Sequence, residues 1–311
     1  MNKGIEIVVF GTLNMDFVTY VDHLPAVGET IAATTFNLGP GGKAANQAVA
    51  ASRLGSKVAM VGRVGDDHLG RKLKEQLDHS GIDHKHVRYT PNKDTGMAVI
   101  SVDKVGLNTI VTFVGANGSL SKQDIDEVEL MLKQAKFAII QMEMEQEVGE
   151  YIIRKAHELD VHVVLNLAPV VSIKQEVLGL VDLLIVNETE ASQMTGMEVN
   201  SVISAQDAAQ ALFDNGIQQV IVTLGANGAV LKTPILLEHY VSPKVTAIDS
   251  TAAGDCFVAA TTSFWCKDGS LDTAVEKAVE VASFSVTKKG AQASLPTFDE
   301  YMQFKQTLVS Q

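Results

Sequence analysis

A carboxylate directly behind four small residues gives this sequence its clearest chemical signal. Residues 251–254 are Thr-Ala-Ala-Gly, Asp255 follows them, and the residues from Cys256 to Ala260 continue in a helical pattern. The first N–H groups of a helix lack partners within the helix and lie at the positive end of its dipole, so small side chains leave room there for a phosphate. An aspartate would repel that phosphate, but it suits a base that takes a proton from an attacking hydroxyl. An ordinary helix start with a dipole-complementing aspartate has the same short pattern.

A second segment, rich in glycine, precedes an alanine-rich helical pattern. Residues 39–47 read Gly-Pro-Gly-Gly-Lys-Ala-Ala-Asn-Gln, and Gly55 ends the helical pattern that follows. Glycines let the backbone approach a ligand, and Lys43 and Asn46 place a cation and an amide about one turn apart. This arrangement suits a polyhydroxyl compound whose product carries a phosphate. It is not a Walker A loop, because Ala44 follows the lysine where that motif has Ser or Thr. A tight turn before a closely packed helix also has this pattern.

Together, the two segments resemble the signatures of the ribokinase family of sugar kinases, a GGKGANQ-like run and a D-T-x-A-A-G-D-x-F run. The corresponding segments here are residues 41–47 and 249–257. The similarity covers essentially the whole chain, in the order that the family has. Further matching segments lie at 11–16, 28–30, 141–143, 166–169, 187–190, 223–228 and 289–294. The chain is therefore identified as a member of this family.

The resemblance implies the residues that carry the chemistry and hold the sugar. Asp255 would be the base that deprotonates the sugar hydroxyl, and an anion hole for the transferred phosphoryl group would consist of Ala252, Ala253 and Gly254. Amides and carboxylates suit a polyol, because each hydroxyl both donates and accepts. The residues that match the sugar-holding positions are Asn14, Asp16, Gly42, Lys43, Asn46, Glu143 and Asp255.

The resemblance also implies ATP, Mg²⁺ and an activating K⁺ as cofactors. Glu190 would belong to the network that positions Mg²⁺ and its waters, and Val279 stands where many members place a polar or His side chain against adenine. The nucleotide site would consist of Asn187, Glu190, Thr223, Gly225, Ala226, Gly228, Gly254 and Val279. A monovalent-cation loop, binding mostly through backbone carbonyls, would consist of Asp249, Thr251, Ser285, Lys288, Gly290 and Ser294. The Lys288 ammonium would point away from that loop.

Short β-branched runs alternate with helical patterns along the chain. Strands are expected at 58–62, 137–141, 162–166, 183–186 and 219–223, besides a first strand at 5–10. Helices are expected at 69–79, 124–134, 148–159, 205–215 and 274–286, with capping patterns at 121–124 and 204–207. This alternation predicts an α/β fold, a mostly parallel central sheet between two helix layers, with ligands at the carboxyl ends of the strands. The resemblance implies the same three-layer α/β/α architecture.

Two regions contain strand pairs without intervening helices. Residues 15–21 pair with 31–38, and residues 97–103 pair with 109–114, which predicts a small sheet over the substrate site. We therefore expect lid strands at approximately 14–38 and 96–115, inserted in a single domain that spans residues 1–311. The resemblance implies that such a lid forms the interface of a homodimer.

Charge and composition exclude several classes of protein. The formal net charge is −12 and the sequence pI is about 5.1, which argues against a surface for nucleic acid or anionic membranes. No apolar run has the length that a membrane span needs. Two cysteines in 311 residues form no disulfide framework, so we expect a reducing, cytoplasmic location.

The resulting hypothesis is an ATP-dependent ribokinase, which converts D-ribose and MgATP to ribose 5-phosphate and ADP. The rivals are a 2-deoxyribose kinase, or another sugar or nucleoside kinase of the same type. Residues 284–287 are similar to deoxyribose kinases, but such relatives tend to have an apolar residue at the position of Asn14. A rival of a different class is a non-catalytic sugar-binding protein with the same fold. The intact Asp255, Gly254 and Asn187 argue against that reading.

Overall fold

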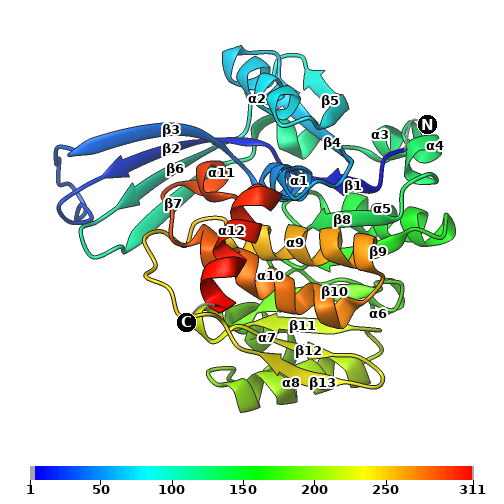
Figure 1. Ribbon diagram of the computed structural model, residues 1–311. Helices are drawn as coiled ribbons and strands as arrows, with labels where there is room; N and C mark the ends of the chain where they lie inside the picture. Colours follow the sequence, from blue (N-terminus) through cyan, green and yellow to red (C-terminus); the bar gives the residue numbers. More distant parts are fainter. Residues whose placement is uncertain (1–3, 310–311) are drawn as a thin grey trace.

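The computed structural model describes residues 4–309 and contains two β-sheets, the larger of which is covered by helices (Figure 1). The larger sheet has nine strands in the order β13-β12-β11-β10-β9-β8-β1-β4-β5. Its strands are parallel except at the β11–β12 and β12–β13 pairs. They are β1 (Ile7–Phe10), β4 (Val58–Gly65), β5 (Asp83–Thr90), β8 (Phe137–Gln141), β9 (His162–Asn166), β10 (Leu183–Asn187), β11 (Val220–Thr223), β12 (Ala229–Lys232) and β13 (Leu237–Tyr240). The predicted α/β class with a mostly parallel central sheet is confirmed.

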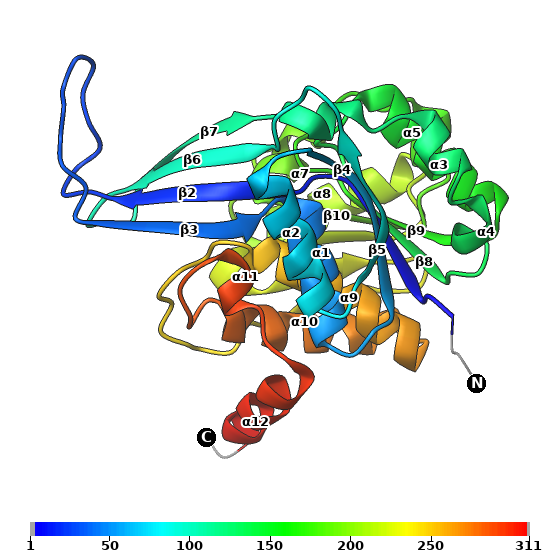
Figure 2. The same cartoon turned by 90° about the horizontal axis from the view of Figure 1, so that it is seen from above.

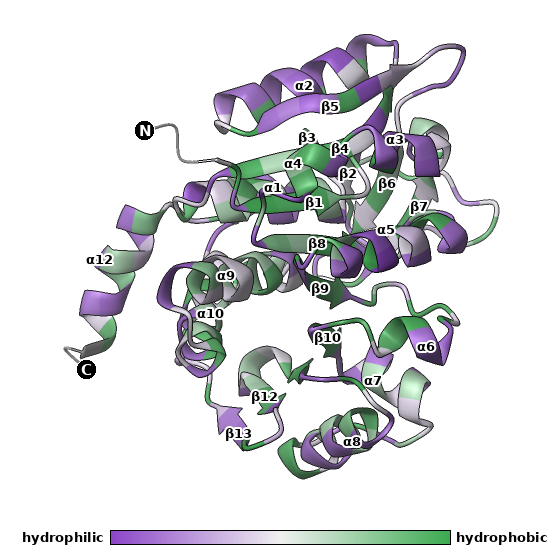
Figure 3. Cartoon of the chain, turned by 90° about the vertical axis from the view of Figure 1, so that its right-hand side faces the viewer, coloured by the Kyte–Doolittle hydropathy of each residue, from purple (hydrophilic) through white to green (hydrophobic). Residues whose placement is uncertain are grey.

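Both faces of the central strands are apolar, because helices cover both. In β1, Ile7 and Val9 join one hydrophobic cluster, while Val8 and Phe10 join the other, as the alternation of side chains along a strand requires. The first cluster includes side chains of α1 (Lys43–Arg53), α2 (His68–His79), α9 (Ala253–Asp268) and α10 (Leu271–Ser285). The second includes side chains of α3 (Lys122–Asp126), α4 (Glu129–Leu132), α5 (Gln146–Glu158), α6 (Gln175–Leu178), α7 (Glu188–Thr195) and α8 (Val202–Asp214). Figure 3 shows the apolar strands between these layers.

The order of the strands reverses at β1, which pairs with β4 on one side and β8 on the other. From β1 the chain first builds the sheet outward through β4 and β5, and later in the opposite direction through β8 to β11. At such a switch point the connections diverge and leave a crevice at the carboxyl ends of the strands. The fold therefore places a ligand site beyond Phe10, where residues 11–14 leave β1.

Small side chains bring α1 close to α9. Ala44, Ala48 and Ala51 of α1 are buried in the same cluster as Ala259 and Ala260 of α9, and the two helices contact each other. The distance between packed helices depends on the size of the side chains between them. The alanine-rich composition of both helices thus lets their amino-terminal ends, which carry the two sequence signatures, meet at the switch point.

The smaller sheet forms the predicted lid, projecting from the side of the main body (Figures 1 and 2). Its strand order is β3-β2-β6-β7, with β2 (Asn14–Tyr20), β3 (Thr35–Gly41), β6 (Met97–Val102) and β7 (Asn108–Phe113). The prediction that a lid strand begins at residue 31 is wrong, since β3 begins at Thr35 and continues to Gly41. Pro40 is tolerated there because β3 is an edge strand with one free side.

Other boundaries also differ from the predictions. The expected helix at 124–134 is two short helices, α3 and α4, and α8 begins three residues earlier than predicted. Ser201 caps α8 by accepting from the Ser204 N–H, so Ser204 lies inside the helix instead of before it. Strand β5 was not predicted, because this half-exposed edge strand lacks an apolar run.

The remaining elements are the helices α11 (Ala291–Ser294) and α12 (Phe298–Val309) and two short 3₁₀ helices, η1 (Gly115–Ser119) and η2 (Gly225–Asn227). Within residues 4–309, no helix is long and apolar enough to cross a membrane.

Candidate active site

The amino terminus of α9 has the geometry of an anion site. Ala252 adopts a left-handed conformation with φ 61°, and α9 begins at the next residue. The Ala253 N–H donates to the Ser250 carbonyl oxygen, whereas the N–H groups of Gly254 and Asp255 have no partner among the described residues. A Cβ at Gly254 would meet no atom within 4 Å, and both Gly254 and Asp255 line a cavity. The helix dipole and free N–H donors together suit an anion.

Asp255 is held by two amide side chains from α1. Asn46 Nδ2 donates to its Oδ2 at 2.9 Å, and Gln47 Nε2 donates to its Oδ1 at 3.0 Å. Burial raises the pKa of Asp255 to about 6, although these two hydrogen bonds and the charge of Lys43 oppose the shift. A carboxylate with a pKa close to neutrality is both ionised at physiological pH and basic enough to accept a proton. Gln47 lay within a sequence signature, but no role had been assigned to it.

A cluster of charged side chains lies beside Asp255. Lys43 Nζ donates to Glu143 Oε1 at 2.5 Å, and Thr12 Oγ1 donates to the other carboxylate oxygen at 2.6 Å. Burial and the negative charges of Glu143 and Asp255 raise the pKa of Asp16 to about 7. Burial lowers the pKa of the Lys43 ammonium, but the negative charges of Glu143 and Asp255 outweigh this effect and raise the pKa above its usual value. The cluster offers both donors and acceptors, as recognition of hydroxyl groups requires.

The orientation of Asn14 is fixed by a residue that the sequence did not reveal. The Leu13 N–H donates to Asn117 Oδ1, so Asn117 must turn its Nδ2 toward the Leu13 carbonyl and Asn14 Oδ1. Asn14 Nδ2 has no partner among the described residues and is left as a donor. Asn117 belongs to η1, far from Asn14 in the chain and outside any motif, so no local signal identified it.

Two glycines bring the backbone close to these side chains. A Cβ at Gly41 would lie 2.0 Å from Asp16 Oδ2. Gly42 has φ 90°, and a Cβ there would lie 2.8 Å from the Thr12 carbonyl oxygen and the Asn14 nitrogen. Any larger residue would displace the sugar-site candidates, which explains the glycines at these positions.

These groups surround a cavity of about 430 Å³ between the large sheet and the lid. The lid contributes Ala98, Ile100 and Ile110 from its inner face. The cavity brings together most predicted site residues, namely Asn14, Asp16, Gly42, Lys43, Asn46, Glu143, Asn187, Glu190, Thr223, Thr251, Ala252, Gly254 and Asp255. It is not lined by Ala253, Gly225, Ala226, Gly228 or Val279. Val279 is 4% exposed and packs in the core, so its expected place against a base stays a prediction.

Asn187, which also lines the cavity, is the N-cap residue of α7. Its Oδ1 accepts from the Glu190 N–H and Glu190 Oε2 accepts from the Asn187 N–H, both at 2.9 Å, which forms a capping box. Burial raises the pKa of Glu190, against the opposing effects of the Asn187 hydrogen bond and the Lys43 charge. The capping box leaves Asn187 Nδ2 and Glu190 Oε1 for a ligand.

The candidate cation loop lies beside the amino terminus of α9. Asp249 Oδ1 accepts from the N–H and the hydroxyl of Thr251, and Asp249 Oδ2 accepts from the Gly290 N–H at 2.8 Å. Although burial opposes its charge, these bonds hold the pKa of Asp249 below its usual value. The Lys288 ammonium donates to Glu300 of α12 and so points away, as expected. Side-chain hydroxyls of Ser285 and Ser294 donate to carbonyls of their own turns.

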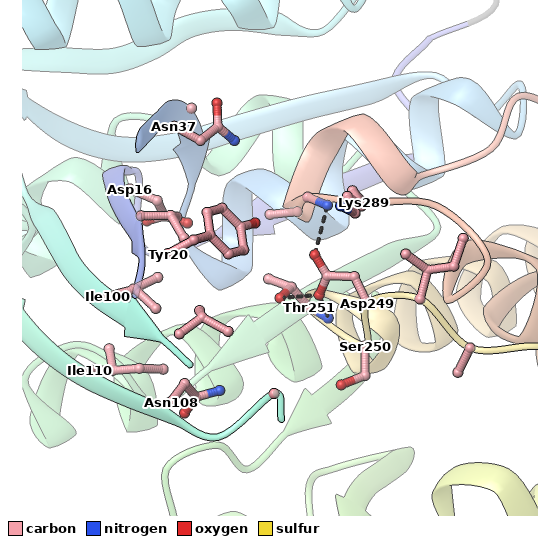
Figure 4. A pocket seen from close by; sticks show the side chains of 18 of the residues that line it. Asp16, Tyr20, Asn37, Ile100, Asn108, Ile110, Asp249, Ser250, Thr251 and Lys289 are labelled. Carbon is pink, nitrogen blue, oxygen red and sulfur yellow. Dashed lines mark hydrogen bonds between the residues drawn. The ribbon is translucent and has the colours of Figure 1, made fainter. Parts of the chain in front are cut away.

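A second cavity, of about 360 Å³, lies between the inner face of the lid and this loop (Figure 4). Tyr20 from β2 lines one side, and Asp249 and Thr251 line the other. Burial and the charge of Asp249 raise the pKa of Tyr20. The two cavities share lining residues, including Asp16 and Ser250, so the lid spans both the candidate sugar site and the candidate cation loop.

Comparisons with known proteins agree with this geometry. The profile of the pfkB family carbohydrate kinases matches residues 5–298. A ribokinase of Haemophilus influenzae is 38% identical over 296 residues, which cover 95% of this chain and 97% of that protein. A deoxyribokinase of Salmonella typhi is 35% identical over 301 residues, which cover 96% of this chain and 98% of that protein.

A solved structure extends the likeness to three dimensions. Arabidopsis thaliana ribokinase complexed with ribose and ATP superposes with a TM-score of 0.90 at 30% identity, over 97% of this chain and 98% of that one. The matches cover the switch-point crevice, the lid and the amino terminus of α9 together. The chain belongs to the pfkB family of carbohydrate kinases, phosphotransferases that act on a sugar.

Proposed function

We propose that this enzyme is an ATP-dependent ribokinase that phosphorylates the 5-hydroxyl of D-ribose. The observation that carries the choice of sugar is the orientation of Asn14. Because Asn117 occupies its Oδ1, Asn14 presents only N–H donors to the cavity. A 2-hydroxyl accepts such a bond, whereas a 2-deoxy sugar would leave the half-buried donor unpaired at a cost of about 1–3 kcal/mol.

In the proposed reaction, Asp255 accepts the proton of the 5-hydroxyl as its oxygen attacks the γ-phosphorus of ATP. The P–O bond to ADP breaks, and the phosphoryl group moves to ribose. The free N–H groups at the start of α9 receive the charge on the transferred group, and the open space at Gly254 gives it access. The cluster of Asp16, Lys43 and Glu143 holds the remaining hydroxyls.

The donor sets also fit the two cations. Glu190 Oε1 and Asn187 line the same cavity as the sugar cluster, and Mg²⁺ held there with ATP would neutralise phosphate charge. The Asp249 carboxylate and the carbonyls of the 285–294 segment are oxygen ligands of the kind that hard cations take. K⁺ in that loop would steady the turn at Ala252 that aims the free N–H groups.

A 2-deoxyribose kinase is the second candidate, favoured by the 35% identity to a deoxyribokinase over nearly the same length. A coupled assay of ADP release tests both candidates with D-ribose, 2-deoxyribose, other pentoses, hexoses and nucleosides. We expect the highest kcat/KM for D-ribose. A higher value for 2-deoxyribose or for a nucleoside would refute the proposed substrate while leaving the family assignment intact.

The proposed assembly is a homodimer formed through the lid. Residues that are opposite each other in the strand register share a face, so Val99 and Val111 lie on the outer face, away from the cavity-lining Ile100 and Ile110. Val99 is 48%, Val111 70% and Phe113 49% exposed. A contiguous exposed apolar face of this kind is typical of an interface. A second copy related by a two-fold axis would cover it.

We further propose that the enzyme works in the cytoplasm. Cys256 and Cys266 are both free and buried. Burial raises the pKa of the Cys256 thiol to about 12, which keeps it protonated and unreactive. We expect the enzyme to keep its kinase activity when it is expressed in a reducing compartment and assayed without any oxidant.

A further inference from the structure

A chain of buried amide side chains, Gln47, Asn166 and Gln141, adjoins Asp255, and of these three only Asn166 lines the cavity. Gln47 and Gln141 are completely buried, and Asn166 is 9% exposed. Gln47 lines none of the cavities around the site, so it does not touch the sugar or the nucleotide. The proposed reaction does not assign these three side chains a role.

We infer that Gln47 is a positioning residue, which fixes the orientation of the Asp255 carboxylate and keeps it ionised, and that Asn166 and Gln141 set the direction of the Gln47 amide. This inference rests on the proposed role of Asp255 as the base. Gln47 acts only through Asp255.

A backbone carbonyl fixes the direction of the whole chain. Asn166 Nδ2 donates to the Ile185 carbonyl oxygen at 3.1 Å, so Asn166 must turn its Oδ1 toward Gln47. Gln47 then has to present Nε2, which donates to Asn166 Oδ1 at 3.1 Å and to Asp255 Oδ1 at 3.0 Å. Its Oε1 accepts from Gln141 Nε2. The Ile185 carbonyl in the middle of β10 thus determines that Asp255 receives a donor.

The reversed orientation of Gln47 is incompatible with an ionised Asp255. It would bring Gln47 Oε1 against Asp255 Oδ1 and Asn166 Oδ1, three oxygen atoms without a proton between them. Buried acceptors that face one another are unfavourable, and only a protonated Asp255 would relieve the contact. The amide direction and the protonation state of Asp255 are therefore coupled.

Gln47 also provides what Asn46 does not. Asn46 donates to the other oxygen of Asp255, but Asn46 also lines the cavity in which the sugar would bind. Its bond to Asp255 can change when the sugar binds. Gln47 is sealed from the cavity and keeps its donor on Asp255 throughout.

The test is the pH dependence of phosphoryl transfer, measured in single turnovers between pH 5 and 9. Gln47→Met removes the donor at similar volume, and we expect the midpoint of the acid limb to rise by about one pH unit. The rate should fall by about tenfold below the midpoint and recover toward the wild-type value at pH 9. A purely structural defect would lower the rate equally at every pH.

A matched control is Thr262→Val, on the same helix as Asp255. Thr262 is completely buried and its hydroxyl donates to the Val258 carbonyl oxygen, away from the site. This variant should keep the wild-type midpoint. A folded Gln47→Met variant with the wild-type midpoint would overturn the inference.

A second variant keeps the test decisive if Gln47→Met does not fold. Gln141→Met removes the donor to Gln47 Oε1 and breaks no other side-chain hydrogen bond, since Gln141 Oε1 has no partner among the described residues. Gln47 then keeps its direction through Asn166 and Asp255 alone, so the midpoint should shift upward by a smaller amount, and an unchanged midpoint would again contradict the inference. Asp255→Asn separates the two proposals. If Asp255→Asn keeps normal turnover, the assignment of Asp255 as the base fails. If Asp255→Asn loses turnover but Gln47→Met keeps the wild-type midpoint, only the role of Gln47 is refuted.

Discussion

The two walls of the cavity differ in how firmly their side chains are held. On the wall formed by the large sheet, Asp255, Asn46 and Gln47 are buried and tied together by hydrogen bonds. The lid wall presents Ile100 and Ile110 inward, while its outer face carries some of the largest exposed apolar side chains. Chemistry that depends on atomic positions lies on the wall formed by the large sheet, which we call the rigid wall, and the lid encloses the cavity from the other side.

The largest expected effect comes from the rigid wall. Asp255→Asn keeps the shape and the hydrogen bonds but removes the base, so kcat should fall by roughly 10²–10⁴-fold while sugar and ATP binding stay nearly intact. Steady-state kinetics and calorimetric binding measure the two separately. Near-normal turnover would show that the base has been misplaced.

Asn14→Met tests the boundary between the two walls, where β2 of the lid begins. The lost donor matters for ribose but not for 2-deoxyribose, so the ratio of kcat/KM values should shift toward the deoxy sugar by about 5–150-fold. The KM for ATP serves as the internal control and should not change. An unchanged ratio would mean that Asn14 does not face the 2-hydroxyl.

Asp249→Ala tests whether the cation loop supports the rigid wall. We expect the variant to lose its response to K⁺ and to lower kcat on the order of tenfold, because the turn at Ala252 would no longer aim its donors. Sugar binding should weaken less than kcat falls. Wild-type enzyme that is equally active in K⁺ and in a bulky organic cation would contradict the proposal.

Val111→Lys tests the lid wall. In a two-fold interface the new lysine would be present once in each protomer, so two like charges would be buried together. We expect the free energy of dimerisation, measured by sedimentation equilibrium, to become less favourable by about 3 kcal/mol. Ile203→Lys is the matched control, since Ile203 is 72% exposed on α8, outside the lid. Loss of the dimer in both variants, or in neither, would argue against the lid interface.

The last expected effect concerns stability instead of catalysis or assembly. The pKa of Asp16 is raised from 3.8 to about 7 in the folded protein. Its stabilising contribution is therefore complete below pH 3.8 and is lost as the pH rises through about 7. Asp16→Asn should raise the free energy of unfolding at pH 8 by about 1–3 kcal/mol and flatten its pH dependence. Denaturant titrations at pH 4 and 8 check this, with the exposed Asp207→Asn as control; equal gains at both pH values would contradict it.

Much of the fold could be predicted because its signals are local. The apolar runs of β1, β8 and β9 and the periodicity of α5 depend on neighbouring residues, and the structure contains these elements close to the predicted positions. Polar edge strands such as β5 escaped prediction, since pairing with β4 stabilises them without an apolar run. The start of α8 was misplaced because Ser201 and Ser204 both suit a cap, and the choice between them depends on packing.

The sequence by itself determined which chemical groups are present: small residues before Asp255, glycines before Lys43, and a carboxylate at Asp249. Only the tertiary structure decided which groups meet. Asn46 and Asp255 are 209 residues apart in the chain, and Asn14 and Asn117 are 103 apart. The direction of an amide depends on its partners, and those partners arrive from other strands and helices. The roles of Gln47 and Asn117 were therefore absent from every local pattern and emerge from the packing of α1, α9 and η1 around the end of β1.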